Sequence, residues 1–176
     1  IDGSLCIHFS MRLPLLIFCA LGQLYAGDWP QYLGPQRGGT AQDEAAITGD
    51  AEPEMLWKRM LGTGFAGPVV AKGRVIVFHH QGADMVTEAL DVADGKAIWK
   101  QTYPATYRDS FGFDNGPRAV PCIAEGKVIT HGPEGIVQSL DFETGKLLWS
   151  YDTVAELESP QGYFGRACSP LVTEGK

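Results

Sequence analysis

The feature that most constrains this chain is an internal repeat. Residues 67–77 (GPVVAKGRVIV) match residues 120–130 (VPCIAEGKVIT), and a third copy begins at residues 169–176 (SPLVTEGK). Each copy is typical of a short strand, a tight turn at a glycine and a second strand, because glycine supplies the positive φ that a hairpin turn needs. The unit recurs about every 50 residues, which is a spacing of repeat architectures.

A second hairpin follows the first in each copy. Residues 90–99 (LDVADGKAIW) match residues 140–149 (LDFETGKLLW), with Gly95 and Gly145 at the turns. One unit is therefore four antiparallel strands, which is the size and pattern of a propeller blade. The sequence predicts an all-β fold: a β-propeller fragment of four-stranded antiparallel blades, about two complete and others partial. Because a blade cannot bury both of its apolar faces alone, we expect an intact protein of seven or eight blades.

The repeat also predicts how the chain is divided. Met55–Lys58 (MLWK) is typical of an outer strand, and we expect it to close the last blade from the other end of the chain. The expected segments are an extended segment (27–54), that closing strand (55–58), a blade (65–100), an inter-blade loop (101–118), a second blade (119–150), a second inter-blade loop (151–167) and the start of a truncated blade (168–176).

The sequence before residue 27 is typical of a leader. Met11–Ala26 has one Arg, an apolar run and a small residue at its end, as a secretory signal peptide does, and the run is too short for a membrane span. A buried strand is the alternative. We expect residues 1–10 to be upstream translation, Met11 to be the start, and the protein to be exported to the periplasm or cell surface of a Gram-negative-type bacterium. Cys19 lacks the preceding small residues that a lipoprotein needs.

The net charge of the chain bears on its partners, and its cysteines bear on whether it carries a disulfide. The net charge of −7 argues against nucleic acid, because its binding relies on Lys and Arg neutralising phosphates. After cleavage no transmembrane span is expected. Cys122 and Cys168 would remain, and the sequence leaves open whether they form a disulfide, which export permits, or stay as two buried thiols.

Three tryptophans, Trp57, Trp99 and Trp149, end the outer strands of successive units. A large ring with one N–H can lie between blades, bury much apolar area and donate to a backbone carbonyl. We therefore interpret them as blade-docking residues.

At residues 91–99 and 141–149 the pattern D-x-x-[DT]-G-K-x-x-W is similar to the tryptophan-docking motif of the PQQ-like (pyrroloquinoline-quinone-type) β-propeller repeat family. Residues 28–39, 111–118 and 162–167 resemble an exported branch of that family found in planctomycete-type bacteria. The resemblance implies one of two kinds of protein. One kind is a binding scaffold, as in the outer-membrane-assembly propellers, and the other is a quinoprotein dehydrogenase that uses PQQ and calcium.

We expect a scaffold that binds a protein or a small anionic ligand, with no catalytic or metal residue in this chain. The alternative is a PQQ-dependent alcohol or sugar dehydrogenase whose catalytic residues lie beyond Lys176. The resemblance implies that such enzymes often carry a vicinal Cys-Cys pair, and this sequence has none. A propeller hydrolase has no nucleophile motif here to support it.

The connections between blades are the predicted binding face. Strand parity places residues 64–68, 112–118 and 162–166 at one end, where each leads into an innermost strand beside the central channel. Arg and His gathered there would suit an anion. The candidate ligand-binding residues are Arg118, Arg166, Asp114, Asn115, His79 and His131.

Other interpretations of these residues stay open. The two arginines could instead hold the loops through Asp114 or backbone carbonyls. A metal site from His79, His80 and His131 is disfavoured, because adjacent strand residues point to opposite faces. The aromatic loop at 103–118 could either contact a ligand or pack as a lid over the blade junction.

Overall fold

The computed structural model describes residues 27–41 and 54–175. The predicted upstream segment (1–10) and signal peptide (11–26) lie outside the described residues. In the described part of the chain, no helix is long and apolar enough to cross a membrane.

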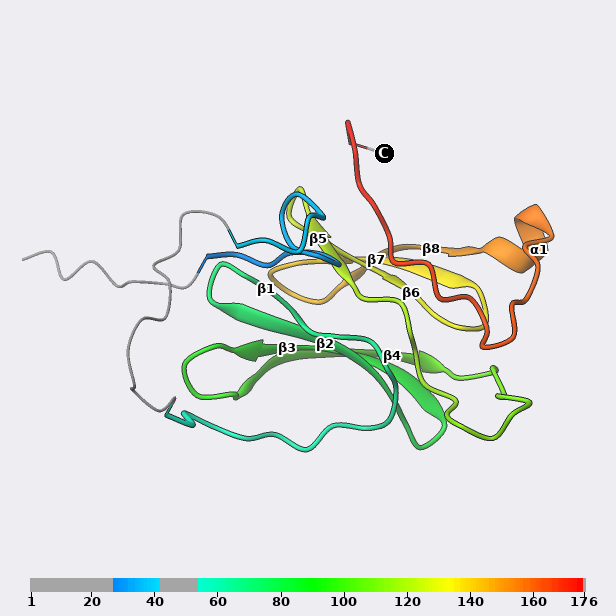
Figure 1. The fold of residues 1–176 in the computed structure, drawn as a ribbon, viewed down its shortest axis with the longest axis horizontal. Coiled ribbons are helices and arrows are strands. Elements are labelled where there is room, and N and C mark those ends of the chain that lie inside the picture. The colour runs from blue at the N-terminus through cyan, green and yellow to red at the C-terminus, as the bar shows by residue number, and fades with distance from the viewer. Residues whose placement is uncertain (1–26, 42–53, 176) are drawn as a thin grey trace, which may run out of the picture.

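The chain forms two four-stranded antiparallel sheets, in the orders β1-β2-β3-β4 and β5-β6-β7-β8. The two sheets lie side by side as successive blades (Figure 1). This confirms the predicted all-β propeller architecture. The strands of the first sheet are β1 (Val69–Ala71), β2 (Arg74–Gln81), β3 (Asp84–Asp91) and β4 (Ala97–Pro104), and those of the second are β5 (Cys122–Ala124), β6 (Lys127–His131), β7 (Ile136–Asp141) and β8 (Leu147–Asp152).

The repeated glycine turns are built alike. Lys72 and Gly73 have φ of 48° and 74°, and Glu125 and Gly126 have φ of 49° and 71°. Two successive residues with positive φ match the twist of the flanking strands in a two-residue hairpin. Glu174 and Gly175 have the same pair of angles, 49° and 73°, so the third copy of the repeat makes the same turn.

Each outer strand carries a bulge directly before its tryptophan. In the first sheet Ala89 pairs with Trp99 and Leu90 pairs with Ala97, so Ile98 is the extra residue. In the second sheet Ser139 pairs with Trp149, and Leu140 pairs with Leu147. A bulge re-aims the side chain beside it, and here it turns the tryptophan out of its own sheet.

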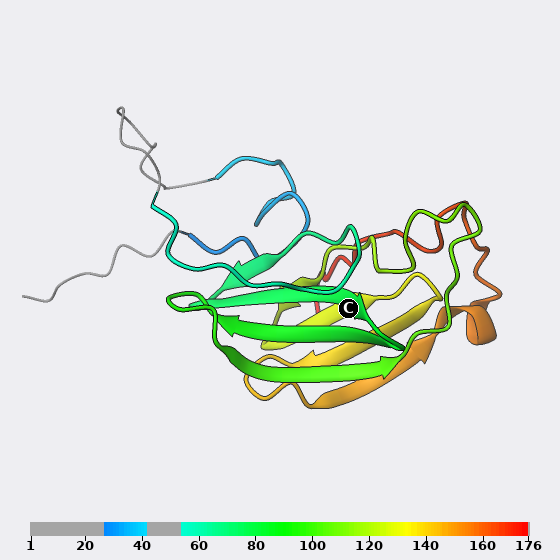
Figure 2. The ribbon, with the colours of Figure 1, turned by 90° about the horizontal axis from the view of Figure 1, so that it is seen from below.

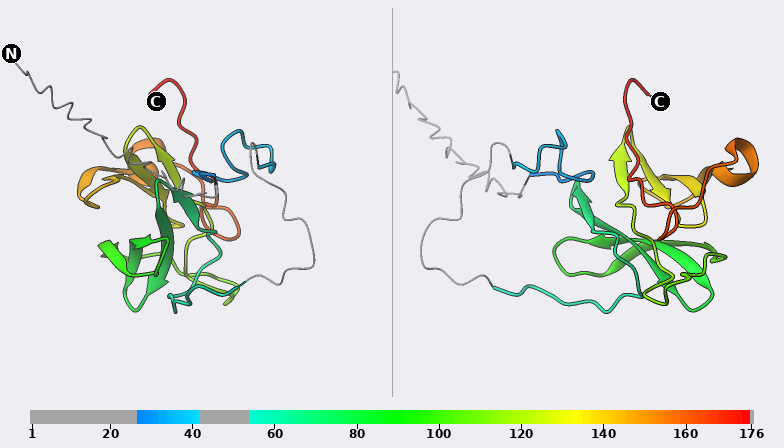
Figure 3. Two further views of the ribbon diagram at one scale, coloured as in Figure 1. Left: turned by 90° about the vertical axis from the view of Figure 1, so that its left-hand side faces the viewer. Right: turned by 45° about the vertical axis from the view of Figure 1, so that its right-hand side comes forward.

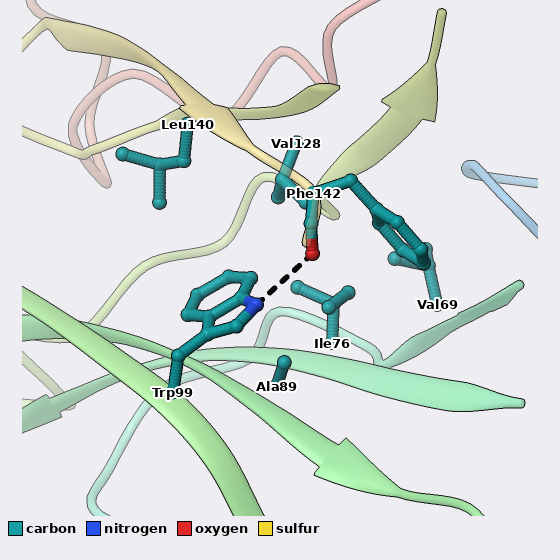
Figure 4. Packing of buried hydrophobic residues seen from close by; sticks show 7 residues of the cluster. All are labelled: Val69, Ile76, Ala89, Trp99, Val128, Leu140 and Phe142. Carbon is teal, nitrogen blue, oxygen red and sulfur yellow. Dashed lines mark hydrogen bonds between the residues drawn. The ribbon is translucent and has the colours of Figure 1, made fainter. Parts of the chain in front are cut away.

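The indole of Trp99 lies between the two sheets. Its Nε1–H donates to the carbonyl of Phe142 at 3.0 Å, and its ring lies where a Cβ on Gly145 would be, 2.5 Å from Cδ2. Around it is a core drawn from both blades (Figure 4). Its buried members are Val69, Ile76, Ala89, Trp99, Val128, Leu140 and Phe142.

Trp57 repeats this arrangement on the other side of the first blade. Its Nε1–H donates to Val92 at 2.8 Å, and its ring covers Gly95. Trp149 is half exposed. Each docked tryptophan therefore packs on the glycine turn of the next blade along the chain.

Some boundaries differ from those expected. Residues 55–58 belong to none of the strands in the described part of the chain; Trp57 is held by its ring rather than by a strand ladder. The outer strands extend to Pro104 and Asp152, four and two residues past the predicted blade ends. A short helix, α1 (Thr153–Leu157), follows β8, because Asp152 caps it by accepting from Val154 and Ala155.

Replacing Gly145 by Ala tests the docking of Trp99, because the added Cβ would collide with the indole. Gly126→Ala is the matched control: its φ of 71° is close to the 70° of Gly145, yet nothing lies within 4 Å of its added Cβ. Both variants lose about 1–2 kcal/mol to left-handed backbone. Gly145→Ala should lose about 1–3 kcal/mol more from overpacking, measured by urea unfolding. Equal losses would contradict the docking role.

Candidate functional site

The connections between blades meet at one end of the sheets and are tied to each other. The N–H groups of Phe65 and Ala66 both donate to the Pro117 carbonyl, at 2.8 and 3.0 Å. A Cβ on Gly116 would lie 2.3 Å from the Thr63 carbonyl oxygen, so only glycine allows this approach. The loops at 105–118 and 158–168 also run side by side, at the right of Figure 2.

Asp109 organises the long loop from its centre. Its carboxylate accepts the N–H groups of Phe111, Phe113 and Asp114, at 3.3, 2.6 and 3.1 Å. Its own N–H donates to the Asn115 side-chain oxygen at 2.8 Å. Burial acts to raise the pKa of Asp109, but these N–H donors and Arg118 together hold it below its ordinary value. The loop is therefore a fixed structure.

Arg118 holds this loop from within. Its guanidinium donates to the carbonyls of Gly116 and Asp114, at 2.6 and 2.9 Å, and lies 3.8 Å from the Asp109 carboxylate. Three aromatic rings surround it with centroids 5.3 to 5.9 Å away, those of Tyr107, Phe65 and Phe164. Only 9% of the side chain is exposed. The positive charge of Arg118 is therefore balanced mainly by the Asp109 carboxylate and the two carbonyls, and little by solvent.

Five aromatic side chains of the inter-blade connections face solvent. They are between 47 and 81% exposed, and four of them form a chain of ring contacts with centroids 5.5 to 6.5 Å apart. A hollow of about 350 Å³ lies among Phe65, Phe113, Phe164, Arg118 and Ala167. We call this the aromatic surface: Phe65, Phe111, Phe113, Tyr163 and Phe164.

The sequence left open whether the aromatic residues of the loop at 103–118 contact a ligand or pack over the blade junction, and the structure divides them between these two roles. Tyr107 is 4% exposed and packs below Arg118, whereas Phe111 and Phe113 are more than half exposed. The loop therefore packs down at its start and presents rings at its tip. Sequence reasoning missed the contact of Phe111 and Phe113 with Tyr163 and Phe164, which lie about 50 residues, or one blade repeat, further along.

Arg166 lies in a separate, polar hollow of about 270 Å³ that also involves Arg108 and Glu134. Its guanidinium donates to the carbonyl of Glu134 at 3.1 Å and to that of Ser159. We expected Arg118 and Arg166 to lie together and favour an anion. Instead they lie in separate hollows, and each guanidinium donates to backbone carbonyls near it.

Beside that hollow a carboxyl group is buried. A Cβ on Gly132 would lie 2.2 Å from both Glu134 Oε1 and the Tyr103 hydroxyl oxygen, so these groups fill the space that the glycine leaves. Burial raises the pKa of Glu134, although the Tyr103 hydroxyl and Arg166 act to lower it. Burial also raises the pKa of Tyr103.

The candidate histidines contact other parts of the protein. His79 Nδ1 accepts the Gly62 N–H at 3.1 Å, and its Nε2 lies 3.4 Å from Glu88. His131 Nδ1 lies 3.1 Å from the Cys168 carbonyl. Burial lowers the pKa of both rings. Within residues 27–41 and 54–175, no group of three or more His, Cys, Asp or Glu side chains is placed to hold a metal ion.

The two cysteines stay apart as thiols. Cys122 is buried and Cys168 is exposed, and both are free.

Of the candidate ligand residues, the structure brings Arg118, Asp114 and Asn115 together in one loop. Arg166, His79 and His131 lie in contacts of their own.

Comparison with known proteins places this architecture in a family. Residues 41–175 match the family described as "Outer membrane protein assembly factor BamB". The chain belongs to this family. Its blades are PQQ-like propeller blades, and its relatives include both a BamB protein and alcohol dehydrogenases, among them a quinohemoprotein alcohol dehydrogenase of Pseudomonas putida that is 36% identical over 35% of this chain and 8% of its own length.

Curated relatives of this BamB-family chain fall into those two groups. The 1-butanol dehydrogenase (cytochrome c) of Thauera butanivorans is 26% identical over 94% of this chain and 24% of its own length. The outer membrane protein assembly factor BamB of Shewanella oneidensis is 28% identical over 65% of this chain and 30% of its own. The chain spans less than a third of the length of either relative.

Among solved structures, BamB from Moraxella catarrhalis is 21% identical, with a TM-score of 0.42. The match covers 55% of this chain and 26% of that one.

Removing either arginine tests the loop-holding contacts. Arg118→Ala and Arg166→Ala should each lower Tm by roughly 5 °C, because each leaves carbonyls without a charged donor. Arg108→Ala is the control, since Arg108 is exposed and donates only to carbonyls near it in the chain. Thermal unfolding followed by circular dichroism measures the effect. An unchanged Tm in the first two variants would instead indicate arginines reserved for a ligand.

Glu134 should make stability depend on pH. Because its folded pKa is raised, its favourable contribution is complete below the unfolded value of about 4.3 and is lost as pH rises through the folded pKa. Glu134→Gln should therefore gain stability relative to the wild type between pH 4.5 and pH 8. The exposed Glu125→Gln is the control. Parallel Tm curves for wild type and Glu134→Gln would refute the assignment.

Proposed function

We propose that this chain is part of an exported binding scaffold, which holds an apolar segment of a partner protein on the aromatic surface. The observation that carries the proposal is the exposure of five aromatic rings from three inter-blade connections. Phe65, Phe113 and Phe164 line one hollow, and Phe111 and Tyr163 join them through ring contacts. Contiguous exposed apolar patches mark interaction sites, and aromatic residues dominate the energetics of protein interfaces.

The rigidity of the supporting loops favours binding. Asp109 fixes the backbone that carries Phe111 and Phe113 through three N–H groups, and Arg118 stacks beneath Phe65 and Phe164. Rings held in place lose little conformational entropy when a partner arrives, and this preorganisation raises affinity.

The electrostatics favour an apolar partner group over a free anion. Arg118 already contacts two carbonyls and a carboxylate, and Arg166 contacts two carbonyls. The Arg118 charge is paired with Asp109, and the N–H groups of both guanidinium ions are directed at the protein's own backbone rather than at a phosphate or carboxylate. A side chain such as Leu, Met or Phe would fill the hollow and bury its walls.

The family relationship supports the same proposal. The Shewanella oneidensis relative is named as an outer membrane protein assembly factor, and contact with a partner protein is the role that we propose by analogy for this chain. Export, inferred from the leader-like sequence of residues 11–26, is part of the proposal.

A quinone-dependent alcohol dehydrogenase is the second candidate, because one relative that aligns with nearly the whole chain is a dehydrogenase. The described residues offer no carboxylate cluster that would fit calcium, so this candidate relies on residues outside them. Purified protein supplied with PQQ and calcium should show no dye-linked oxidation of 1-butanol. Cofactor-dependent oxidation would favour the dehydrogenase.

Photo-crosslinking tests the scaffold directly. p-Benzoylphenylalanine placed at Phe113 in the producing bacterium should yield a discrete crosslinked protein. The same group at Leu157, an exposed apolar residue on α1, should not. Phe164→Ser should reduce the Phe113 adduct about tenfold, as expected for loss of an interface aromatic. Equal adducts at residues 113 and 157 would contradict the proposal.

A further inference from the structure

A segment distant from the aromatic surface lies along the inner edges of both blades. Trp29 and Val70 exchange two backbone hydrogen bonds, of 2.7 and 2.9 Å, and the Ile123 N–H donates to Pro30 at 2.7 Å. Val70 is in β1 and Ile123 is in β5. We call residues 28–39 the strap; it is the blue segment beside β1 and β5 in Figures 1 and 3.

The strap occupies edges that the sheets leave open. β1 and β5 are the first strands of their sheets and pair on one side only, with β2 and β6. An unpaired strand edge presents N–H and C=O groups that another extended chain can bind. In a propeller these edges line the central channel, so the strap lies against the channel wall.

Contacts at both ends hold the strap across successive repeats. The Asp28 carboxylate accepts the Lys72 N–H at 3.0 Å, at the turn after β1. The Arg37 guanidinium donates to the Pro170 carbonyl at 3.1 Å, at the start of the third repeat. The strap therefore touches the first strand of two blades and the beginning of the next repeat.

The strap is also shaped by its own contacts. Gly34 N–H donates to Gln31, Arg37 N–H to Gly34 and Gly39 N–H to Leu33, at 3.0, 3.0 and 2.9 Å. Gly34 has a φ of 80°, and a Cβ there would lie 2.8 Å from the Trp29 ring. The indole thus packs on glycine backbone and folds the strap into a compact unit.

We propose that the inner edges of β1 and β5 form a strand-acceptor site, and that the strap is its permanent occupant. The occupant is specified by backbone pairing at Trp29 and Pro30, by the Asp28 and Arg37 anchors and by the Trp29–Gly34 packing. With the strap in place, this wall of the channel is closed to any other extended chain. Partners are directed to the loop end, although the inference does not depend on the aromatic surface being a binding site.

Hydrogen exchange measures whether the site is occupied in solution. In the wild-type chain the amides of Val70 and Ile123 should be protected, because both donate to the strap. Gly34→Ala should speed their exchange roughly tenfold or more, while the amides of β3, paired on both sides, stay protected. Gly39→Ala is the matched control, since its φ of 70° is also left-handed but its added Cβ would meet only Leu33, at an ordinary 3.8 Å, and it should leave both amides protected. Unprotected Val70 and Ile123 amides in the wild type would overturn the proposal.

A synthetic peptide of residues 27–40 tests the acceptor site itself. Added in excess to Gly34→Ala, it should restore protection at Val70 and Ile123, and the same peptide carrying Gly34→Ala should not. Equal effects of the two peptides would refute a specific site. If Gly34→Ala also loses protection in β3, hydrogen exchange at Val70 and Ile123 is measured instead in the double variant Asp28→Ala with Arg37→Gln, which lacks both anchors. Unchanged protection in that variant would refute the role of the anchors.

Discussion

The structure depends on one contact, a tryptophan ring laid on a glycine of the next blade. A four-stranded blade is apolar on both faces, so each sheet is stable only against a neighbour. Trp99 fills that junction with the largest side chain available and satisfies its N–H on Phe142. The bulge beside Ile98 aims the ring outward, and Gly145 makes room for it. Strand, bulge, turn and core at this junction are all parts of a single docking device.

The repeat made the fold predictable, since it showed the hairpins, the turn glycines and the docking tryptophans together. The bulges were not visible, because Ile98 and Leu148 read as ordinary strand residues and only the pairing register reveals the extra position. Outer-strand ends were placed short, because β4 continues through polar residues that carry no apolar signal. The helix α1 rests on the Asp152 cap, and five residues are too few to show a helical period.

The candidate site was predictable in place but less so in chemistry. Strand parity located the loops at one end, and the aromatic and arginine residues were recognised there. A sequence does not show whether a guanidinium is free, and the carbonyls of Gly116, Asp114, Glu134 and Ser159 already engage both arginines. The ring contacts of the aromatic surface join side chains from adjacent repeats. Such a surface exists only after the blades have docked, so Trp99 docking supports the proposed function as much as the loops do.

The strap implies an order of assembly. Hairpins close between near neighbours in the chain, whereas Asp28 meets a partner 44 positions away and Arg37 one 133 positions away. The entropy of closing such long loops must be offset by surfaces that already exist. The first blade offers the strap Val70 and Lys72, but the strap's contacts with Ile123 and Pro170 form only after the second blade and the start of the third repeat are in place. The strap precedes both blades in the sequence but completes its contacts after they have folded, so its docking marks the formation of the inner edges of β1 and β5.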